Sequence, residues 1–361
     1  MSVQTPFPPM IVAFVVTVVF MLALRPLAQI IDLVDRPGGR KAHGAEVPII
    51  GGIAMFSGVF AGLVLVTGAA ALVDTLFLAS LLLVVIGVLD DKFALSASVR
   101  VSIQIAAVLI MFYGTGFQLA DIGDPFGTGV IAMGPFTLIA TAVVSLTVIN
   151  AYNLIDGADG LAGSLALIAM LAISCVGGIA SPTTAVALTI SAAVVGFLVF
   201  NYPVNWNRPV RSFMGDAGST FLGFTILWIV LGASQGPDRV VSPVVGLWFA
   251  SIPIYDLLTC FVKRQLAGKS PFQPGRDHFH HVLNRGTTRV RHTLLVLTAL
   301  QATYAGIGVF GHFANAPDWL MFGGWSLLGL LQFRIIRKLA SYKRWVRLQR
   351  RSRRRIGAVA G

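Results

Sequence analysis

The sequence predicts an all-α integral membrane protein with about eleven transmembrane helices. Its 361 residues have a mean hydropathy of +0.81 and only 12% are charged, which is far more apolar than an ordinary soluble domain. Apolar runs of about 20 residues, the length that crosses ~30 Å of hydrocarbon, recur along nearly the whole chain. These runs do not alternate between apolar and polar residues, as the strands of an outer-membrane barrel would.

Most runs are bounded by a local signal. No basic residue precedes the first run and Arg25, Arg36 and Lys41 follow it, the reverse of the charge order in a cleavable signal peptide, so we expect it to remain as a span. The third run closes at "VLDDKF" before a Ser-Ala-Ser segment, and the eighth begins after "FMGDAGS". The expected spans lie near residues 10–31, 48–66, 74–89, 100–118, 132–150, 161–180, 183–200, 217–235, 243–262, 293–312 and 318–336.

The basic residues predict the topology. With the N-terminus outside, eleven crossings put the C-terminus in the cytoplasm. On this assignment 26 of the 27 Lys and Arg residues face the inside and only Arg239 lies outside, in agreement with the positive-inside rule. We expect one membrane catalytic domain over residues 1–340 and a basic cytoplasmic tail over 341–361. Its inside loops are expected at 32–47, 90–99, 151–160, 201–216 and 263–292.

The acidic residues are concentrated on the same predicted face. Ten of the fifteen fall at or near it, mostly where a helix meets a loop. A proton or ion pathway would place some carboxylates near the middle of a span, so the pattern argues against a transporter and for a site open to the cytoplasm. The ten are Asp32, Asp35, Glu46, Asp90, Asp91, Asp156, Asp159, Asp216, Asp256 and Asp277.

Carboxylates recur on three consecutive inside loops. Asp90 and Asp91 are adjacent, so both can face one cavity only where their helix ends, whereas Asp156 and Asp159 would share a face on a helical turn. Asp216 stands between glycines that let backbone and ligand approach closely. Close carboxylates repel by about 4 kcal/mol per pair at an effective dielectric near 20. A hard cation such as Mg²⁺ or Mn²⁺, sharing its shell with substrate phosphates, is therefore expected among them.

Each cluster also has a purely structural explanation. Two aspartates at a helix end can be a solvated cap, Asp-Gly in "NLIDGADG" is a common turn dipeptide, and "GDAGS" alone is a weak signal. Their joint appearance favours a site. Cys175 and Cys260 lie within apolar runs, where we expect them to pack rather than to form a disulfide.

The long inside loop over residues 263–286 supplies positive charge. Arg264 and Arg276, with further basic residues, can clamp phosphates. Half of the chain's six histidines, His278, His280 and His281, stand in four positions of this loop. We expect them to hydrogen-bond a pyrophosphate. Zinc binding is less favoured because no cysteine is near, and an ordinary solvated loop is a third interpretation.

Five segments together resemble a known family. In order they are "RKAHGAEVPIIGG", "LDDKFALS", "NAYNLIDGADGLAG", "FNYPVNWNRPVRSFMGDAGS" and "SPFQPGRDHFHHVL". They resemble the signature loops of the polyprenyl-phosphate N-acetylhexosamine-1-phosphate transferases. The resemblance covers residues 40–283. It implies that a lipid phosphate attacks the sugar-linked phosphorus of a UDP-sugar and releases UMP. Phe279, which interrupts the histidine run, resembles the branch that uses UDP-N-acetylglucosamine and undecaprenyl phosphate.

The resemblance also implies residue roles. Asp216 matches the metal-binding aspartate and Asn153 a second metal contact. Asp90 and Asp91 match aspartates proposed to deprotonate or orient the lipid phosphate. The remaining matches are Asp156 and Asp159 for metal or sugar-nucleotide handling, Asn201 and Phe213 for uracil, and His278, His280, His281, Arg264 and Arg276 for the pyrophosphate.

One of these implied roles conflicts with the chemistry of phosphate. A phosphate monoester loses its second proton near pH 6, so the nucleophile gains little from a general base at neutral pH. We therefore expect Asp90 to orient the acceptor or Lys92 instead, and we expect Lys92 to contact the substrate. A two-step route through an aspartyl intermediate stays open.

Other functions account for part of the pattern. A carrier of nucleotide sugars or lipid-linked sugars would share the spans and the basic inner surface, but it needs no cluster of inside carboxylates. A family member with another donor, such as the pentapeptide precursor or a 6-deoxy-N-acetylhexosamine, would keep the site. We expect a bacterial inner-membrane enzyme with a cytoplasmic site. The sequence leaves its oligomeric state and the pathway of its product open.

The densest positive charge lies in the tail "YKRWVRLQRRSRRR", residues 342–355. We expect it to meet the anionic inner leaflet rather than nucleic acid, or to act only as a topogenic signal. All the motifs precede residue 292, so no catalytic group is expected in the tail.

Overall fold

The computed structural model describes residues 7–36, 46–65, 70–178, 181–203, 210–268, 278–284 and 290–359. Over these residues the fold is helical, apart from a short antiparallel pair of strands in which Val34 pairs with Pro48 and Asp35 with Val47. The elements are α1 (Phe7–Ile30), β1 (Val34–Asp35), β2 (Val47–Pro48), α2 (Gly51–Leu63), α3 (Ala70–Phe93), α4 (Ala97–Thr115), the 3-10 turn η1 (Gly134–Phe136), α5 (Thr137–Ile155), α6 (Leu161–Gly177), α7 (Pro182–Asn201), α8 (Gly215–Ser234), α9 (Pro243–Phe249), α10 (Ser251–Leu266), α11 (Phe279–Asn284), α12 (Val290–Phe313) and α13 (Asp318–Val359).

Each of the eleven expected spans coincides with a helix or, for the ninth, with two helices. Among the described residues eight helices are long and apolar enough to cross a membrane, and nine if α9 and α10 count as one broken span. The two others, α2 and α6, have 13 and 17 residues. A helix of 13 residues is only about 20 Å long. The polytopic all-α class is therefore confirmed, while the number eleven and the orientation stay predictions.

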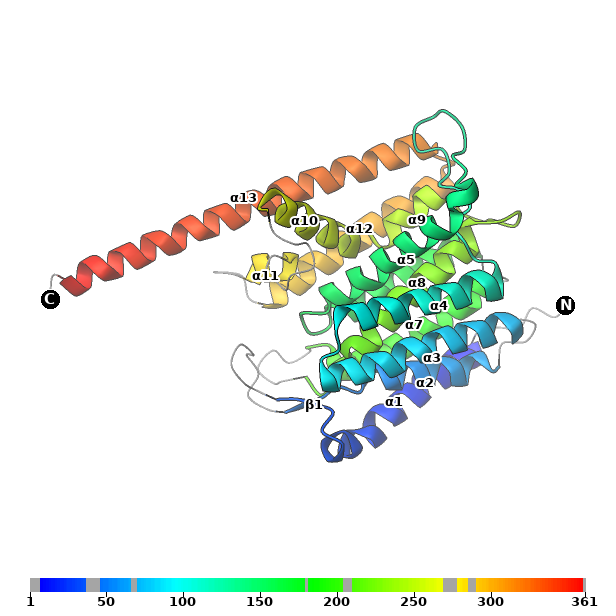
Figure 1. Cartoon of the computed structure of the whole chain (residues 1–361), viewed down its shortest axis with the longest axis horizontal. Coiled ribbons are helices and arrows are strands. Elements are labelled where there is room, and N and C mark those ends of the chain that lie inside the picture. Colours follow the sequence, from blue (N-terminus) through cyan, green and yellow to red (C-terminus); the bar gives the residue numbers. More distant parts are fainter. Residues whose placement is uncertain are drawn as a thin grey trace.

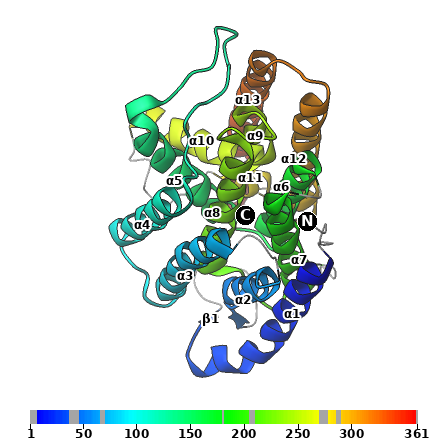
Figure 2. The same cartoon turned by 90° about the vertical axis from the view of Figure 1, so that its right-hand side faces the viewer.

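Helix α8 lies at the centre of the bundle, with α2, α3, α5, α6 and α7 around it (Figure 2). In its span 89% of the residues are buried, against 22% for α1 and 17% for α13. Small residues allow this close packing. Gly87 of α3 rests directly on the backbone at Ala217, and Gly52 of α2 rests on Gly218. These contacts fix the first turn of α8, which carries Asp216.

Successive long helices run in opposite directions, so the described parts of the motif loops gather at one end of the bundle. This end, which we call the site end, carries β1 and α11 and lies opposite the N-terminus (Figure 1). Figure 1 also shows that the last part of α13 runs past the site end. The sequence predicted a span ending near residue 336, but the helix continues to Val359.

The ninth predicted span, residues 243–262, is not one straight helix. Its two parts, α9 and α10, meet at an angle of 85° at Ala250. Pro253 explains the break, because proline has no N–H to donate to the carbonyl four residues earlier, that of Phe249. Gln301 of α12 replaces the missing bonds: its Nε2 donates to Phe249 O at 2.7 Å, and its Oε1 accepts from Ile252 N at 2.9 Å.

Candidate active site

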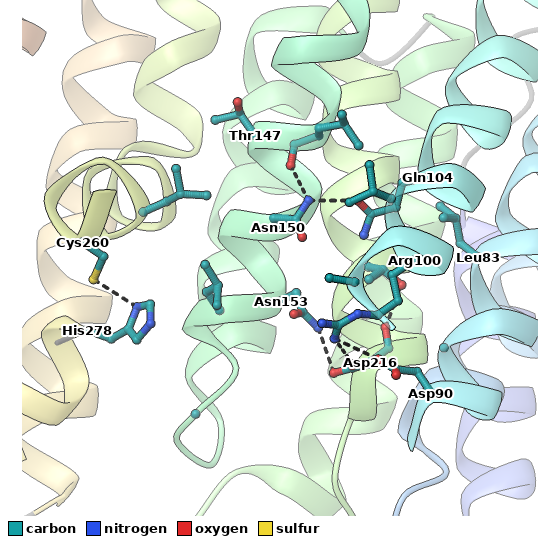
Figure 3. A pocket seen from close by; sticks show the side chains of 18 of the residues that line it. Leu83, Asp90, Arg100, Gln104, Thr147, Asn150, Asn153, Asp216, Cys260 and His278 are labelled. Carbon is teal, nitrogen blue, oxygen red and sulfur yellow. Dashed lines mark hydrogen bonds and ion pairs between the residues drawn. The ribbon is translucent and has the colours of Figure 1, made fainter. Parts of the chain in front are cut away.

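A pocket of about 720 Å³ opens among α3, α4, α5, α8, α10 and α11 at the site end (Figure 3). One part of its lining is polar and includes Asp90, Arg100, Asn153, Asp216 and His280. The other part is apolar and includes Leu83, Ile86, Val101, Leu257 and Phe261. The pocket therefore offers a charged region and, continuous with it, a surface suited to hydrocarbon.

The start of α8 holds two of the predicted carboxylates together. The backbone N–H of Asp216 donates to both carboxylate oxygens of Asp91, at 3.0 and 3.1 Å. Gly215 has φ +73° and lies against the Asp91 carboxylate, so a side chain there would be strained and would collide with it. Asp216 points its own side chain into the pocket, where Asn153 Nδ2 donates to its Oδ1 at 2.8 Å.

Arg100 joins the two carboxylate motifs, although its sequence position predicted only a cytoplasmic basic residue. Its Nη1 lies 3.0 Å from Asp90 Oδ2 and 3.5 Å from Asp216 Oδ2. The turn between α3 and α4 makes this possible: Leu95 N donates to Asp90 Oδ1 at 2.7 Å, and Ser96 caps α4 by accepting from Val99 N. The sequence signal that could have identified Arg100 as a site residue was its position in the first turn of a helix, just after the capping Ser96.

Lys92 lies elsewhere. Its side chain is exposed, with Nζ 5.4 Å from the centroid of the Phe93 ring, and it does not line the pocket. The carboxylate of Asp90 therefore orients Arg100 and not Lys92, and the alternative expectation that it orients the acceptor stays a prediction. Lys92 as a substrate contact stays a prediction.

Asp156 and Asp159 lie in the turn between α5 and α6 and not on a helical turn. Both side chains are half-buried, and Asp159 has partners of its own. Burial and, to a smaller extent, the neighbouring carboxylates of Asp216, Asp91 and Asp159 together raise the pKa of Asp156 to about 8. In the protein alone, Asp156 is therefore largely neutral at pH 7, and a cation among these carboxylates would favour its ionised form.

The histidine segment packs against this turn. The imidazole of His280 rests on Gly157, where a Cβ would overlap it. The side chain is only 1% exposed, yet neither ring nitrogen has a hydrogen-bond partner among the described residues. Burial, then the neighbouring His281 and His278, lower the pKa of His280 to about 3. A buried imidazole without partners beside the pocket is a group that a ligand can satisfy.

His278 is anchored on α10. Its Nδ1 lies 2.8 Å from Asp256 Oδ2 and 3.4 Å from Cys260 Sγ. The expectations that no cysteine is near the histidines and that Cys260 only packs were therefore wrong: Cys260 is one turn after Asp256 on the helix that carries the loop. Arg264, one further turn along, is 8% exposed and lines the pocket with His281.

Two groups of residues could hold a metal. Asp216, Asn153 and the neighbouring carboxylates offer oxygen ligands around an open pocket, which fits a hard cation such as Mg²⁺. Asp256, Cys260 and His278 are all buried and have ligand atoms within 4.8 Å of one another. However, zinc at 2.0–2.1 Å from each ligand would keep nitrogen and oxygen roughly 3.3 Å apart. The observed distance of 2.8 Å between His278 Nδ1 and Asp256 Oδ2 is instead that of a hydrogen bond, so the geometry of this second group does not fit zinc.

The predicted uracil contacts do not line the pocket. Both polar atoms of the Asn201 amide are used within the protein: Oδ1 accepts from Gly160 N, and Nδ2 donates to Ser212 O, each at 2.8 Å. Phe213 is half-buried and pairs with Ile49 in an isolated parallel bridge. Contact of either residue with uracil stays a prediction. Arg276 lies outside the described residues.

Comparison with known proteins shows the family. The sequence model described as glycosyl transferase family 4 matches residues 73–234. The chain is 32% identical to the undecaprenyl-phosphate alpha-N-acetylglucosaminyl 1-phosphate transferase of Escherichia coli O157:H7, over 99% of this chain and 98% of that protein. It is 34% identical to the protein of the same name from Yersinia pestis, over 98% of each chain. For the one from Pasteurella multocida the identity is 35%, over 96% of this chain and 98% of the relative. The resemblance carried by the five motifs is thus confirmed: the chain belongs to glycosyl transferase family 4 and is a phosphoglycosyl transferase.

Proposed function

We propose that the protein transfers N-acetylglucosamine 1-phosphate from UDP-N-acetylglucosamine to undecaprenyl phosphate. The products are undecaprenyl-diphospho-N-acetylglucosamine and UMP. One observation carries the proposal: the pocket joins carboxylates, Arg100 and histidines to an apolar wall built from α3, α4 and α10. A lipid phosphate needs both surfaces at once, and the names of the relatives contain undecaprenyl phosphate and the N-acetylglucosaminyl 1-phosphate group.

In the proposed reaction an oxygen of the lipid phosphate bonds to the sugar-linked phosphorus of the donor. The bond from that phosphorus to the oxygen bridging the two phosphates breaks, and UMP leaves with that oxygen. The attacking phosphate is already mostly dianionic at neutral pH, since its second pKa is about 6. Catalysis then consists mainly of positioning and charge neutralisation.

Asp216 and Asn153 would hold Mg²⁺, with Mn²⁺ as an alternative, and the bound cation would neutralise charge on the diphosphate. Asp90 holds Arg100 toward the pocket, so we assign Arg100 to the acceptor phosphate. His278, His280 and Arg264 line the opposite side of the pocket, and with His281 and Arg276 they would face the donor diphosphate. Asp156 and Asp159 would complete the surroundings of the cation.

The proposed location is a bacterial inner membrane, with the site end in the cytoplasm. An enzyme with the same site and another UDP-sugar donor is the second candidate, because none of the geometry above distinguishes the sugars.

The test is release of UMP by purified protein given undecaprenyl phosphate, Mg²⁺ and a panel of UDP-sugars. We expect UDP-N-acetylglucosamine to be preferred, chelation to stop the reaction, and Asp216→Asn to lower kcat at least about 100-fold without loss of folded protein. Asp121→Asn, at the far end of the bundle, is the matched control. Preference for another UDP-sugar would reassign the donor, and absence of UMP release with every UDP-sugar would overturn the proposed reaction.

A further inference from the structure

Asp256 is a buried carboxylate in the middle of α10, and its side chain is 0% exposed. Neither the motifs nor the proposed reaction assigns it a task. A carboxylate away from water is costly unless both oxygens are satisfied. Here both are: Oδ1 accepts from the backbone N–H of Phe279 at 2.6 Å, and Oδ2 lies 2.8 Å from His278 Nδ1. The two bonds hold the start of α11 on α10.

The bond to His278 determines which ring nitrogen is available. An ionised carboxylate only accepts hydrogen bonds, so a contact of 2.8 Å requires the proton on Nδ1. Cys260 Sγ lies on the same side of the ring, 3.4 Å from Nδ1. The other nitrogen, Nε2, points away from Cys260 on the side of the pocket (Figure 3). The ring lies parallel to that of His280, with centroids 6.0 Å apart and planes at 11°.

We propose that Asp256 is a positioning residue that fixes His278 with its proton on Nδ1 and presents Nε2 to the pocket. In a ring that carries protons on both nitrogens, Nδ1–H is bonded to Asp256 and Nε2–H faces the pocket. There it can donate to a phosphate oxygen of the donor. The inference deepens the proposed function and rests on it for the identity of that ligand.

The bend between α9 and α10 contributes to this arrangement. Asp256 stands five positions after Ser251, where the new helix direction begins. Helix α10 carries Asp256, Cys260 and Arg264 at intervals of four residues, so the three share one face, and all three are buried. One face of α10 thus supplies the support for the histidine segment, and Arg264 adds a cation at its far end.

The experiment uses the full-length protein and Asp256→Asn. The amide oxygen of asparagine can still accept from Phe279 N–H, but its NH₂ group then faces Nδ1, which must become an acceptor. We expect one of the six histidines to change from Nδ1-protonated to Nε2-protonated in nitrogen-15 NMR of histidine-labelled protein. We also expect kcat/KM for UDP-N-acetylglucosamine to fall about 10–100-fold, with the KM for undecaprenyl phosphate unchanged.

The controls separate this inference from the proposed function. Asp121→Asn makes the same substitution in a partner of Arg239 and should change neither measurement. Unchanged histidine signals and donor kinetics in folded Asp256→Asn would overturn the inference. If that variant does not fold, the wild-type spectrum decides: the signal lost in His278→Gln must be Nδ1-protonated, and an Nε2-protonated signal would overturn the inference. The NMR spectra report the protonated nitrogen of His278 without any turnover, so they test the inference even if the proposed reaction is wrong.

Discussion

At the scale of single residues, Arg100 is the cation that two carboxylates from different helices share. We predict that Arg100→Gln raises the KM for undecaprenyl phosphate and lowers kcat/KM about 100-fold, equivalent to about 2.7 kcal/mol of transition-state stabilisation. Its side chain is 40% exposed, so we expect little change in thermal stability. Steady-state kinetics with varied acceptor measure the effect.

Lys92→Gln is the matched control for Arg100→Gln. It removes a positive charge at the end of α3, close in sequence to the start of α4, but its side chain is exposed and lies over Phe93. Equal losses from the two variants would show that general positive charge, and not the contact with Asp90 and Asp216, supports binding of the acceptor.

Asp156 leads to a prediction about pH. Its folded pKa of about 8 lies above the usual 3.8, so the folded protein binds more protons than the unfolded chain. The contribution of this group to stability therefore falls as pH rises from about 4 to about 8. Asparagine cannot ionise. We predict that in Mg²⁺-free buffer the Tm of Asp156→Asn, relative to wild type, increases between about pH 5 and pH 8, while UMP release decreases.

A difference in Tm that does not change with pH would contradict this account of Asp156. Unchanged UMP release by Asp156→Asn would instead support the alternative that the turn residues only shape the chain, since asparagine is also a good turn former. Asp159→Asn, on the same turn, provides the comparison.

The residues with a sequence motif could be found from the sequence, and those without one could not. Asp90, Asp91 and Asp216 were recognisable as clusters at helix ends, and the structure brings them together. Asp256 and Cys260 were unrecognisable as partners of His278. They precede it by 22 and 18 positions, and only the packing of α10 on α11 brings the three together.

At the scale of elements, Gln301 is the side chain that stabilises the break between α9 and α10. It is 0% exposed and bonds both backbone groups left free by the break. Methionine has nearly the same shape but no amide. We predict that Gln301→Met lowers the free energy of unfolding by roughly 2–4 kcal/mol, because a buried N–H and a buried C=O lose their partners. Thermal unfolding in detergent measures this loss.

Gln332→Met is the control, because Gln332 on α13 is also buried but accepts one bond, from the Tyr304 hydroxyl at 3.0 Å. We expect it to cost about 1 kcal/mol. Equal losses of unfolding free energy in Gln301→Met and Gln332→Met would mean that the backbone groups at the break find other hydrogen-bond partners.

The eleven apolar runs predicted where the helices lie, because apolar length and loop charges are local properties. The break at Ala250 was missed because the apolar composition continues through it, although Pro253 marks the position. The short lengths of α2 and α6 were also missed, because the apolar composition continues past Leu63 and Gly177, where these helices end.

At the scale of the whole molecule, α13 reaches beyond everything else the structure describes (Figure 1). Its 42 residues correspond to about 63 Å of helix, roughly twice the thickness of the hydrocarbon core. Among the residues whose side chains the structure describes, the pocket is lined by residues from α3 to α11 and by none from α13. The helix can therefore contribute to membrane attachment without contributing to the chemistry.

The extension of α13 carries the basic tail, which the sequence placed beside the anionic inner leaflet. Each basic residue near that surface adds about 1 kcal/mol of attraction. We predict that truncation after Ala340 leaves metal-dependent UMP release in detergent largely intact, whereas yield or membrane orientation decreases. Activity assays on purified protein and accessibility labelling in membrane vesicles measure the two effects separately. A truncated protein that inserts correctly and binds UDP-N-acetylglucosamine normally, yet cannot transfer, would show that the functional unit extends past α12 into the tail.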